Sequence, residues 1–498
     1  MIARLLLVAP LACAFAAPAF AGMKAPPPEL AAFVAAVKKA DAIDDPLQRC
    51  LAYPDLPGNT WAPGAAKARC VMFNQRPLFT LGEIEGILQG PGGAKTIDAK
   101  FRALLDAHFT DPNARDQTFT AYLPFADRGK LVWSEGVARK WLAASPDSPY
   151  ANTAVGRVLV NKGWAARGGK WIQDTPRENL IAMSGYFEEA QAHLDKALEI
   201  EPRLLPACEA LMQMGRQADD QVQVKATATC LAADPNSYNV VEEMMNNAEP
   251  RWGGSLREMR EVARYASDHV KENPALAVMT TSHESYEFEL EADEARAIPE
   301  IEPLALRVPN AGYLRTVGGA YLHKDDFWKA FVYLSEALRF MPDYGQESRW
   351  RAYVISELGD PQWARADAQR ALKLEPEDPS ASRMLADILR DTGHSAEARP
   401  LYEVAMREPK LRQNAYIEFC RVAVDRRGFL ACTDALTTEF PDFGPGWYQR
   451  LSALGGYDAP GAENAMRRFL ATYMRDWPLH VKRAQEIRAY MARHDIKE

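Results

Sequence analysis

Ten prolines divide most of the chain into intervals that mostly fall between 32 and 39 residues. Most of them follow an apolar stretch with helical spacing, where proline ends the helix because it has no amide hydrogen and its ring clashes with the preceding turn. The ten are Pro146, Pro202, Pro235, Pro274, Pro309, Pro342, Pro376, Pro409, Pro441 and Pro478. A period of this length predicts an array of helical units, each of which buries its apolar face against the next.

The clearest unit runs from Ala311 to Pro342. Counted from its first residue, it has small residues at positions 8 and 20, Gly318 and Ala330, and a bulky residue, Tyr321, at position 11. The pattern resembles the tetratricopeptide repeat, in which the small residues let two antiparallel helices approach and the bulky residues fill the space between units.

Further units that begin at Gly345 and Pro379 keep the same phase, and the units upstream follow it less closely. The sequence therefore predicts an all-α fold, a tetratricopeptide-like solenoid of helical hairpins wound into a right-handed superhelix, with an irregular and mostly helical N-terminal region. The predicted parts are a signal peptide (1–21), the irregular region (22–125), degenerate repeats with an insertion at about 163–180 (126–309), and regular repeats with C-terminal capping helices (310–498).

The first 21 residues have the pattern of a cleaved secretory signal. Arg4 precedes an apolar run from Leu5 to Ala17, and small residues at Ala19 and Ala21 suit a cleavage site after Ala21. No other stretch is long and apolar enough for a membrane span, so we expect a periplasmic or secreted protein with no integral membrane segment. The net charge of −8 argues against nucleic acid as the main partner.

Six cysteines remain after this cleavage, and an even number in an exported protein favours disulfides over free thiols. Repeat geometry favours pairing between neighbours in the sequence. The expected pairs are Cys50 with Cys70, Cys208 with Cys230, and Cys420 with Cys432. The alternative for cysteines at helix contacts is that they act as small apolar residues.

Four phrases resemble an exported bacterial family known only as domain of unknown function 4034, and together they cover roughly residues 45 to 275. They are RCLAYPDLPGNTW at 49–61, SPDSPYANTA at 145–154, GWAARGG at 163–169 and EPRWGGSLREM at 249–259. The resemblance implies a bacterial envelope setting and no particular activity. The tetratricopeptide-like repeats continue well beyond the region that it covers.

The phrase Arg251 to Ser255 has two interpretations. Ser255 with Glu258 predicts a capping box, so the two glycines before it are expected to form a tight turn into a helix, with Trp252 buried beside it. An aromatic residue next to such a turn can instead form part of a ligand site.

A candidate binding surface follows from the repeat phase. Arg315, Arg349 and Arg383 are spaced 34 residues apart and occupy the same position in the first helix of their units, on the face that lines the concave groove. Guanidinium groups bind carboxylates well, so an acidic peptide or a chain terminus is the predicted ligand. The other lining residues predicted here are His323, Tyr353, Asp387 and Arg390. The alternative is an internal salt bridge between Arg383 and Asp387 at i, i+4.

The sequence contains no motif of a metalloprotease, a nucleophilic hydrolase or a nucleotide-binding loop, so we predict no metal, no cofactor and no catalytic residue. The favoured function is an exported, non-enzymatic repeat protein that binds a protein or peptide partner along its concave groove. Two alternatives stay open. One is an enzyme that acts on cell-wall peptide or glycan with carboxylates outside the regular repeats. The other is self-association through aromatic residues near the C-terminus, at Trp447, Tyr448, Tyr473 and Trp477.

Overall fold

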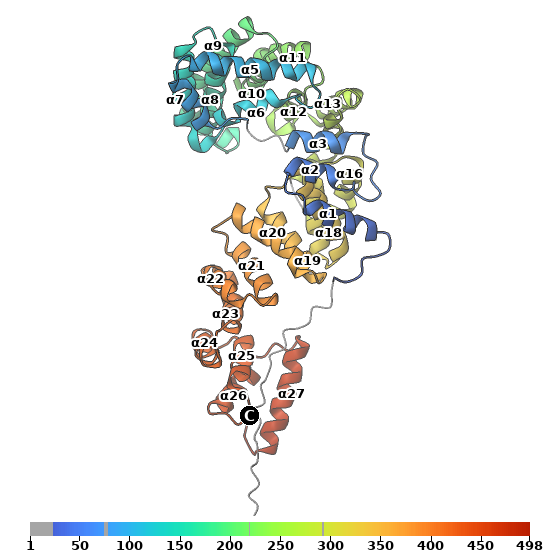
Figure 1. Cartoon of the computed structure of the whole chain (residues 1–498), viewed down its shortest axis with the longest axis vertical. Helices are drawn as coiled ribbons and strands as arrows, with labels where there is room; N and C mark the ends of the chain where they lie inside the picture. The colour runs from blue at the N-terminus through green and yellow to red at the C-terminus, as the bar shows by residue number, and fades with distance from the viewer. Residues whose placement is uncertain (1–22, 74–77, 219, 291–292) are drawn as a thin grey trace, which may run out of the picture. The chain divides into compact units, whose positions relative to one another are not determined.

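The structure is a computed structural model that describes residues 23–73, 78–218, 220–290 and 293–498. Within these ranges the chain forms helices and no strand, which confirms the predicted all-α class (Figure 1). The predicted signal peptide and its cleavage site lie outside the described residues. The chain divides into two compact units: an N-terminal unit of residues 32–320 with 339–341, and a C-terminal unit of residues 321–338 and 342–498 with the stretch up to Ala31.

The N-terminal unit contains the helices up to the start of α17. They are α1 (Ala31–Asp41), α2 (Pro46–Ala52), α3 (Ala65–Phe73), α4 (Leu81–Gln89), α5 (Gly93–Thr110), α6 (Gln117–Tyr122), α7 (Leu131–Ala144), α8 (Pro149–Arg167), α9 (Arg177–Ile200), α10 (Leu205–Ala218), α11 (Asp220–Ala233), α12 (Tyr238–Ala248), α13 (Leu256–His269), α14 (Ser282–Leu290), α15 (Glu294–Arg296), α16 (Glu302–Arg307) and α17 (Ala311–His323). Short 3-10 segments are η1 (Leu123–Phe125), η2 (Arg128–Lys130), η3 (Ile172–Asp174), η4 (Pro250–Trp252) and η5 (Pro274–Thr281), and η6 (Ala297–Ile301) is a π-helical turn.

Helices α8 and α9 form the central hairpin of the N-terminal unit. Two glycines of α8 allow the close approach: a Cβ atom at Gly156 would lie 2.6 Å from Leu194, and one at Gly163 would lie 2.5 Å from Phe187. The connection between the two helices runs over residues 168–176, so the predicted insertion at 163–180 is too long at both ends. Residues 163–167 complete α8, and residues 177–180 begin α9.

The C-terminal unit follows the predicted repeat phase. Its helices are α18 (Phe327–Phe340), α19 (Gly345–Glu357), α20 (Pro361–Leu374), α21 (Pro379–Asp391), α22 (Ser395–Ala405), α23 (Pro409–Arg421), α24 (Arg426–Glu439), α25 (Gly444–Leu454), α26 (Ala462–Thr472) and α27 (Pro478–Arg493). Small residues at positions 8 and 20 are fully buried in both regular hairpins of this unit. They are Ala352 and Ala364 of α19 and α20, and Ala386 and Ala398 of α21 and α22.

The periodic prolines mark helix ends, as predicted. Seven of them lie two residues after the last residue of a helix; Pro146 after Ala144 is one example. The other three, Pro274, Pro409 and Pro478, are instead the first residues of the next helical segment, a position where the absent amide hydrogen costs nothing.

All three predicted disulfides are present. The Cα–Cα distances are 5.6 Å for Cys50–Cys70, 5.7 Å for Cys208–Cys230 and 5.4 Å for Cys420–Cys432. The second pair joins helices α10 and α11, and the third joins α23 and α24. The first two bridges lie in the N-terminal unit and the third lies in the C-terminal unit.

The C-terminal aromatic residues are mostly covered, contrary to the surface considered for self-association. Trp447 is only 8% exposed and its indole N–H donates to the Pro441 carbonyl at 2.7 Å. Tyr448 stacks on His480 of α27 with ring centroids 5.3 Å apart, and Tyr473 packs against the same core. Trp477, 39% exposed, is the one member of this group that presents a large apolar surface. Among the helices that the structure describes, none combines the length and the apolar character needed to cross a membrane.

Candidate functional site

The predicted row of arginines is shared between the two units. Arg315 lies on α17 in the N-terminal unit, whereas Arg349 on α19 and Arg383 on α21 belong to the C-terminal unit. His323 contacts Trp350 with ring centroids 6.3 Å apart. Groove binding by this row stays a prediction.

Within the C-terminal unit, carboxylates lie beside the predicted arginines. Arg383 Nε lies 3.6 Å from Asp387 Oδ2, which is the i, i+4 ion pair considered as the alternative to ligand binding. Arg349 Nε lies 3.7 Å from Asp378 Oδ2. Tyr353 is 39% exposed on the same helix as Arg349 and contacts Phe327.

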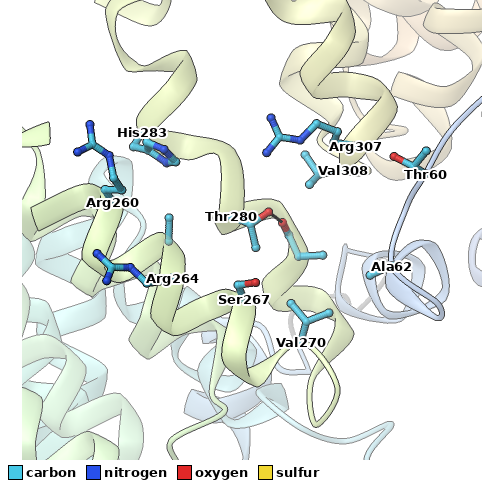
Figure 2. A pocket seen from close by; sticks show the side chains of 12 residues that line it. Thr60, Ala62, Arg260, Arg264, Ser267, Val270, Thr280, His283, Arg307 and Val308 are labelled. Atoms are coloured by element: carbon cyan, nitrogen blue, oxygen red, sulfur yellow. Dashed lines mark hydrogen bonds between the residues drawn. The ribbon is translucent and has the colours of Figure 1, made fainter. Parts of the chain in front are cut away.

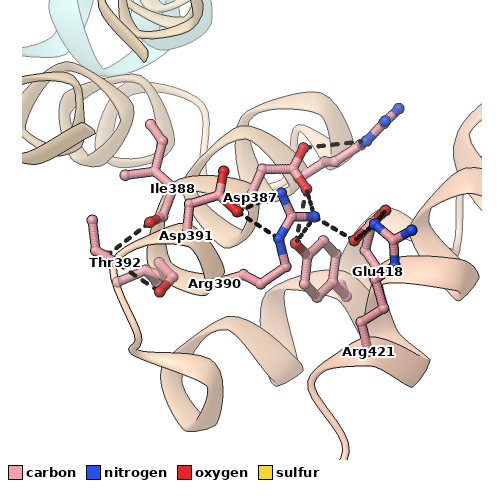
Figure 3. A network of polar contacts seen from close by, with 10 residues as sticks. Asp387, Ile388, Arg390, Asp391, Thr392, Glu418 and Arg421 are labelled. Carbon is pink, nitrogen blue, oxygen red and sulfur yellow. Dashed lines mark hydrogen bonds and ion pairs between the residues drawn. The ribbon is translucent and has the colours of Figure 1, made fainter. Parts of the chain in front are cut away.

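Arg390 is the centre of a closed polar network (Figure 3). It pairs with Asp391 at 2.7 Å, with Asp387 at 3.3 Å and, more closely, with Glu418 of α23. The Tyr402 hydroxyl donates to Asp387 at 2.8 Å. Burial raises the pKa of Asp387, and the Arg390 guanidinium opposes that shift. Because this guanidinium already contacts three carboxylates, it contributes to repeat packing more than to an open cationic site.

A different cationic site lies in the N-terminal unit, and we call it the tryptophan–arginine pocket. It is a cavity of about 690 Å³ between the end of α8, the 168–172 segment, α10, Arg128 and the turn after α12. Its aromatic and basic lining residues are Arg128, Trp164, Arg167, Lys170, Trp171, Arg216, Arg251 and Trp252. Two glycine-rich segments that are far apart in the sequence, GWAARGG and RWGGS, therefore line a single cavity.

Two indole rings form one wall of the pocket. Trp164 and Trp252 meet edge to face with ring centroids 5.7 Å apart. The Arg216 guanidinium lies 4.7 Å from the Trp252 ring and 5.2 Å from the Trp164 ring, and the Arg167 guanidinium lies 5.6 and 5.8 Å from the same two rings. Cation–π contacts of this kind hold the two guanidinium groups in place without neutralising their charge.

Positive charge exceeds negative charge in this pocket. Arg216 pairs with Glu243 at 3.4 Å and Arg251 pairs with Glu249, but within the described ranges Arg128, Arg167 and Lys170 have no ion pair. Arg167 is only 6% exposed, and its Nη1 donates to two backbone carbonyls of the 168–172 segment.

Buried polar atoms in the same pocket lack partners. Among the described residues, Arg167 Nε, Arg216 Nε and Trp164 Nε1 are buried with no hydrogen-bond acceptor. Burial and the neighbouring Arg216 lower the pKa of Arg167. Burial also raises the pKa of Glu243, and Arg216 opposes that shift. An anion at this position would balance the excess positive charge.

The RWGGS turn has the tight turn and the serine cap that its first interpretation predicts, but the Glu258 carboxylate bonds to the Ser255 hydroxyl and not to its backbone amide, and Trp252 is only partly buried. Ser255 caps α13 by accepting a hydrogen bond from the Glu258 amide at 3.2 Å, and Gly253 has a positive φ of 98°. The Glu258 carboxylate accepts from the Ser255 hydroxyl at 2.8 Å. Trp252 is both a packing residue and a lining residue of the pocket, so the two interpretations of this phrase are compatible.

Gly254→Ala should destabilise the N-terminal unit by about 1–3 kcal/mol, because the new Cβ would lie 2.3 Å from the Ala248 carbonyl oxygen and the backbone must move. The matched control is Gly185→Ala at an exposed position of α9, where no atom lies within 4 Å of the added Cβ. Alanine there should stabilise the N-terminal unit by about 0.5–1 kcal/mol. Urea unfolding followed by circular dichroism measures both. Equal stability of the two variants would contradict the close approach.

Comparison with known proteins found distant similarity to solved structures. No family model and no curated protein matches this chain. Among solved structures, the MamA protein is 14% identical with a TM-score of 0.28, over 38% of this chain and 97% of that chain. PilF of Pseudomonas aeruginosa is 16% identical with a TM-score of 0.26, over 61% and 98%. The TPR domain of P58(IPK) is 15% identical with a TM-score of 0.24, over 74% and 98%.

The fold is a tetratricopeptide-like array of helical hairpins. Consecutive helices pair along the chain, as α8 does with α9, α19 with α20 and α21 with α22. The resemblance of residues 45–275 to domain of unknown function 4034 stays a prediction.

Sequence reasoning did not identify the tryptophan–arginine pocket as a candidate site. Arg216 belongs to no distinctive sequence segment. Trp164 and Arg167 lie within an apolar helix whose pattern predicts a packing role in the core. The available signal was that two glycine-rich phrases, at 163–169 and 251–255, each combine tryptophan with arginine.

Proposed function

We propose that this protein is an exported, non-enzymatic adaptor of the bacterial cell envelope that binds an acidic segment of a protein partner in the tryptophan–arginine pocket. Export is supported by the signal-like N-terminus and by three disulfides, which are typical of oxidising compartments. Helical-hairpin repeats commonly present extended surfaces to protein partners.

The observation that carries the proposal is the unbalanced positive charge of the pocket. A carboxylate that enters it meets Arg128, Arg167 and Lys170, which have no ion pair within the described ranges. Charge-assisted hydrogen bonds to guanidinium groups are stronger than neutral ones. Trp171, 58% exposed at the rim, offers a flat apolar surface to the residues beside that carboxylate.

The test compares capture of envelope proteins by three forms of the mature chain. Arg128→Gln with Lys170→Gln removes two exposed charges of the pocket, and Lys95→Gln with Lys225→Gln removes two exposed charges on α5 and α11. The native chain and the α5/α11 control should capture the same partner, whereas the pocket variant should capture at least about tenfold less. A hexaglutamate peptide should compete, and capture should weaken with added salt.

Equal capture by the pocket variant and the native chain, with both forms folded, would contradict the pocket as the binding site. The same experiment includes Arg349→Gln with Arg383→Gln in the C-terminal unit. The Nε atoms of both arginines are buried without a hydrogen-bond acceptor, and their ion pairs are longer than a charge-assisted hydrogen bond. Loss of capture in that variant alone would assign the partner to the predicted arginine row.

A further inference from the structure

The N-terminal unit has a second basic cavity, which we call the histidine pocket (Figure 2). Its volume is about 480 Å³, within the range of small-ligand sites. Arg260 and Arg264 line it from α13, His283 from α14 and Arg307 from the end of α16. Figure 2 shows Arg260, Arg264 and His283 on one side of the hollow and Arg307 reaching toward them from the other. No carboxylate is among the residues that line it.

Two of these arginines place like charges on the same face of α13. Arg260 and Arg264 are one helical turn apart on α13, and like charges at i, i+4 destabilise a helix. Neither has an ion pair within the described ranges, although Arg257 on the same helix pairs with Glu261 at 3.3 Å. The helix thus has carboxylates for pairing, yet its pocket face keeps two unbalanced cations.

The remaining basic groups are oriented by the fold. Arg307 Nη1 lies 2.8 Å from Glu284 Oε2, which directs its guanidinium along the pocket. His283 is half-buried, and its Nδ1 atom is buried without a hydrogen-bond partner among the described residues. Burial lowers the pKa of His283; Glu284 opposes the shift, while Arg260 and Arg307 add to it.

The wall around Arg307 is fixed by a distant part of the chain. The Thr60 amide donates to the Leu306 carbonyl at 2.7 Å, and the Trp61 indole N–H donates to the Ala305 carbonyl at 2.9 Å. These bonds fasten the 49–61 phrase to α16. The hydrogen bonds hold the end of α16, and with it the backbone of Arg307, opposite α13.

We propose that the histidine pocket binds an oxyanion of the phosphate class, with Arg260, Arg264, Arg307 and His283 as its donors. A tetrahedral dianion accepts hydrogen bonds from several directions, and these donors enter from three different helices, whereas a planar carboxylate suits a single guanidinium fork. The volume also admits the organic group of a phosphate ester. This site is separate from the tryptophan–arginine pocket and does not depend on the proposed adaptor function.

Isothermal titration calorimetry of the mature chain with inorganic phosphate and with glycerol 3-phosphate tests the proposal. The native chain should bind at least one probe, and Arg260→Gln with Arg264→Gln should weaken binding by about tenfold or more, since two charge-assisted contacts are lost. Arg257→Gln, a charge change on the same helix outside the pocket, should bind as the native chain does. The arginine positions are exposed, so the variants should fold, which circular dichroism checks.

A second readout locates the bound anion. Ring-proton signals of His283, assigned through His283→Gln, should move when the probe is added, and the signals of His394 in the C-terminal unit should not. Tighter binding of glycerol 3-phosphate than of inorganic phosphate identifies an organic phosphate as the ligand, and equal binding identifies free phosphate. The proposal is overturned if neither probe binds, if the double glutamine variant binds as tightly as the native chain, or if the His283 signals stay unchanged.

Discussion

Asp367→Ala should lower the unfolding free energy of the C-terminal unit by about 3–5 kcal/mol. Arg351 is 1% exposed and Asp367 is 2% exposed, and they form a two-pronged ion pair between α19 and α20. The Arg351 Nε and Nη2 atoms donate to the two carboxylate oxygens at 2.6 and 2.8 Å. Removal of the carboxylate takes two charge-assisted hydrogen bonds from a buried guanidinium, and this cost exceeds the net value of the pair itself. Guanidinium chloride unfolding followed by circular dichroism measures the loss.

Two controls separate charge burial from loss of packing. Arg351→Met with Asp367→Leu removes both charges and should recover most of the lost stability, because the desolvation cost disappears with the pair. Glu397→Ala breaks the more exposed pair with Arg365, whose atoms are 3.1 Å apart, and should cost less than about 1 kcal/mol. A cost for Asp367→Ala as small as that for Glu397→Ala would contradict the buried ion pair.

Cys208→Ala with Cys230→Ala should destabilise the N-terminal unit by about 2–4 kcal/mol. The bridge closes a sequence separation of 22 residues across the α10–α11 hairpin, and both cysteines are fully buried. Its loss restores conformational freedom to the unfolded chain. Denaturant unfolding of the native chain with and without reductant, beside the double variant, measures the effect.

The reductant provides the internal control. It should bring the native chain to the stability of the double variant or below it, because it also opens the Cys50–Cys70 bridge in the same unit. Thiol titration of the unfolded, unreduced mature chain should find no free thiol. A free thiol at either position, or a double variant as stable as the native chain, would show that this pair is not bridged.

Much of the helical architecture follows from the sequence because its determinants are local. Proline limits each helix through its own ring and missing amide hydrogen, and alanine or glycine at positions 8 and 20 permits contact between helices that are adjacent in the chain. The Cys420–Cys432 bridge was predictable for the same reason, since it joins two helices of one hairpin. Where the repeat pattern is degenerate, the helix ends are predicted less accurately. The connection between α8 and α9 is shorter than the insertion that the glycine-rich sequence indicated.

The candidate sites depend on contacts that the repeat period does not specify. The sequence alone determined that Arg383 and Asp387 share a helix face, but the network around Arg390 also requires Glu418 of the next hairpin. Likewise, sequence placed Trp252 beside a tight turn, and only the tertiary structure brought it against Trp164, Arg167 and Arg216. The physical reason is that helical periodicity fixes which face of each helix is apolar. Which distant helix ends meet, and which charges stay unbalanced there, depends on how the helical hairpins pack on one another.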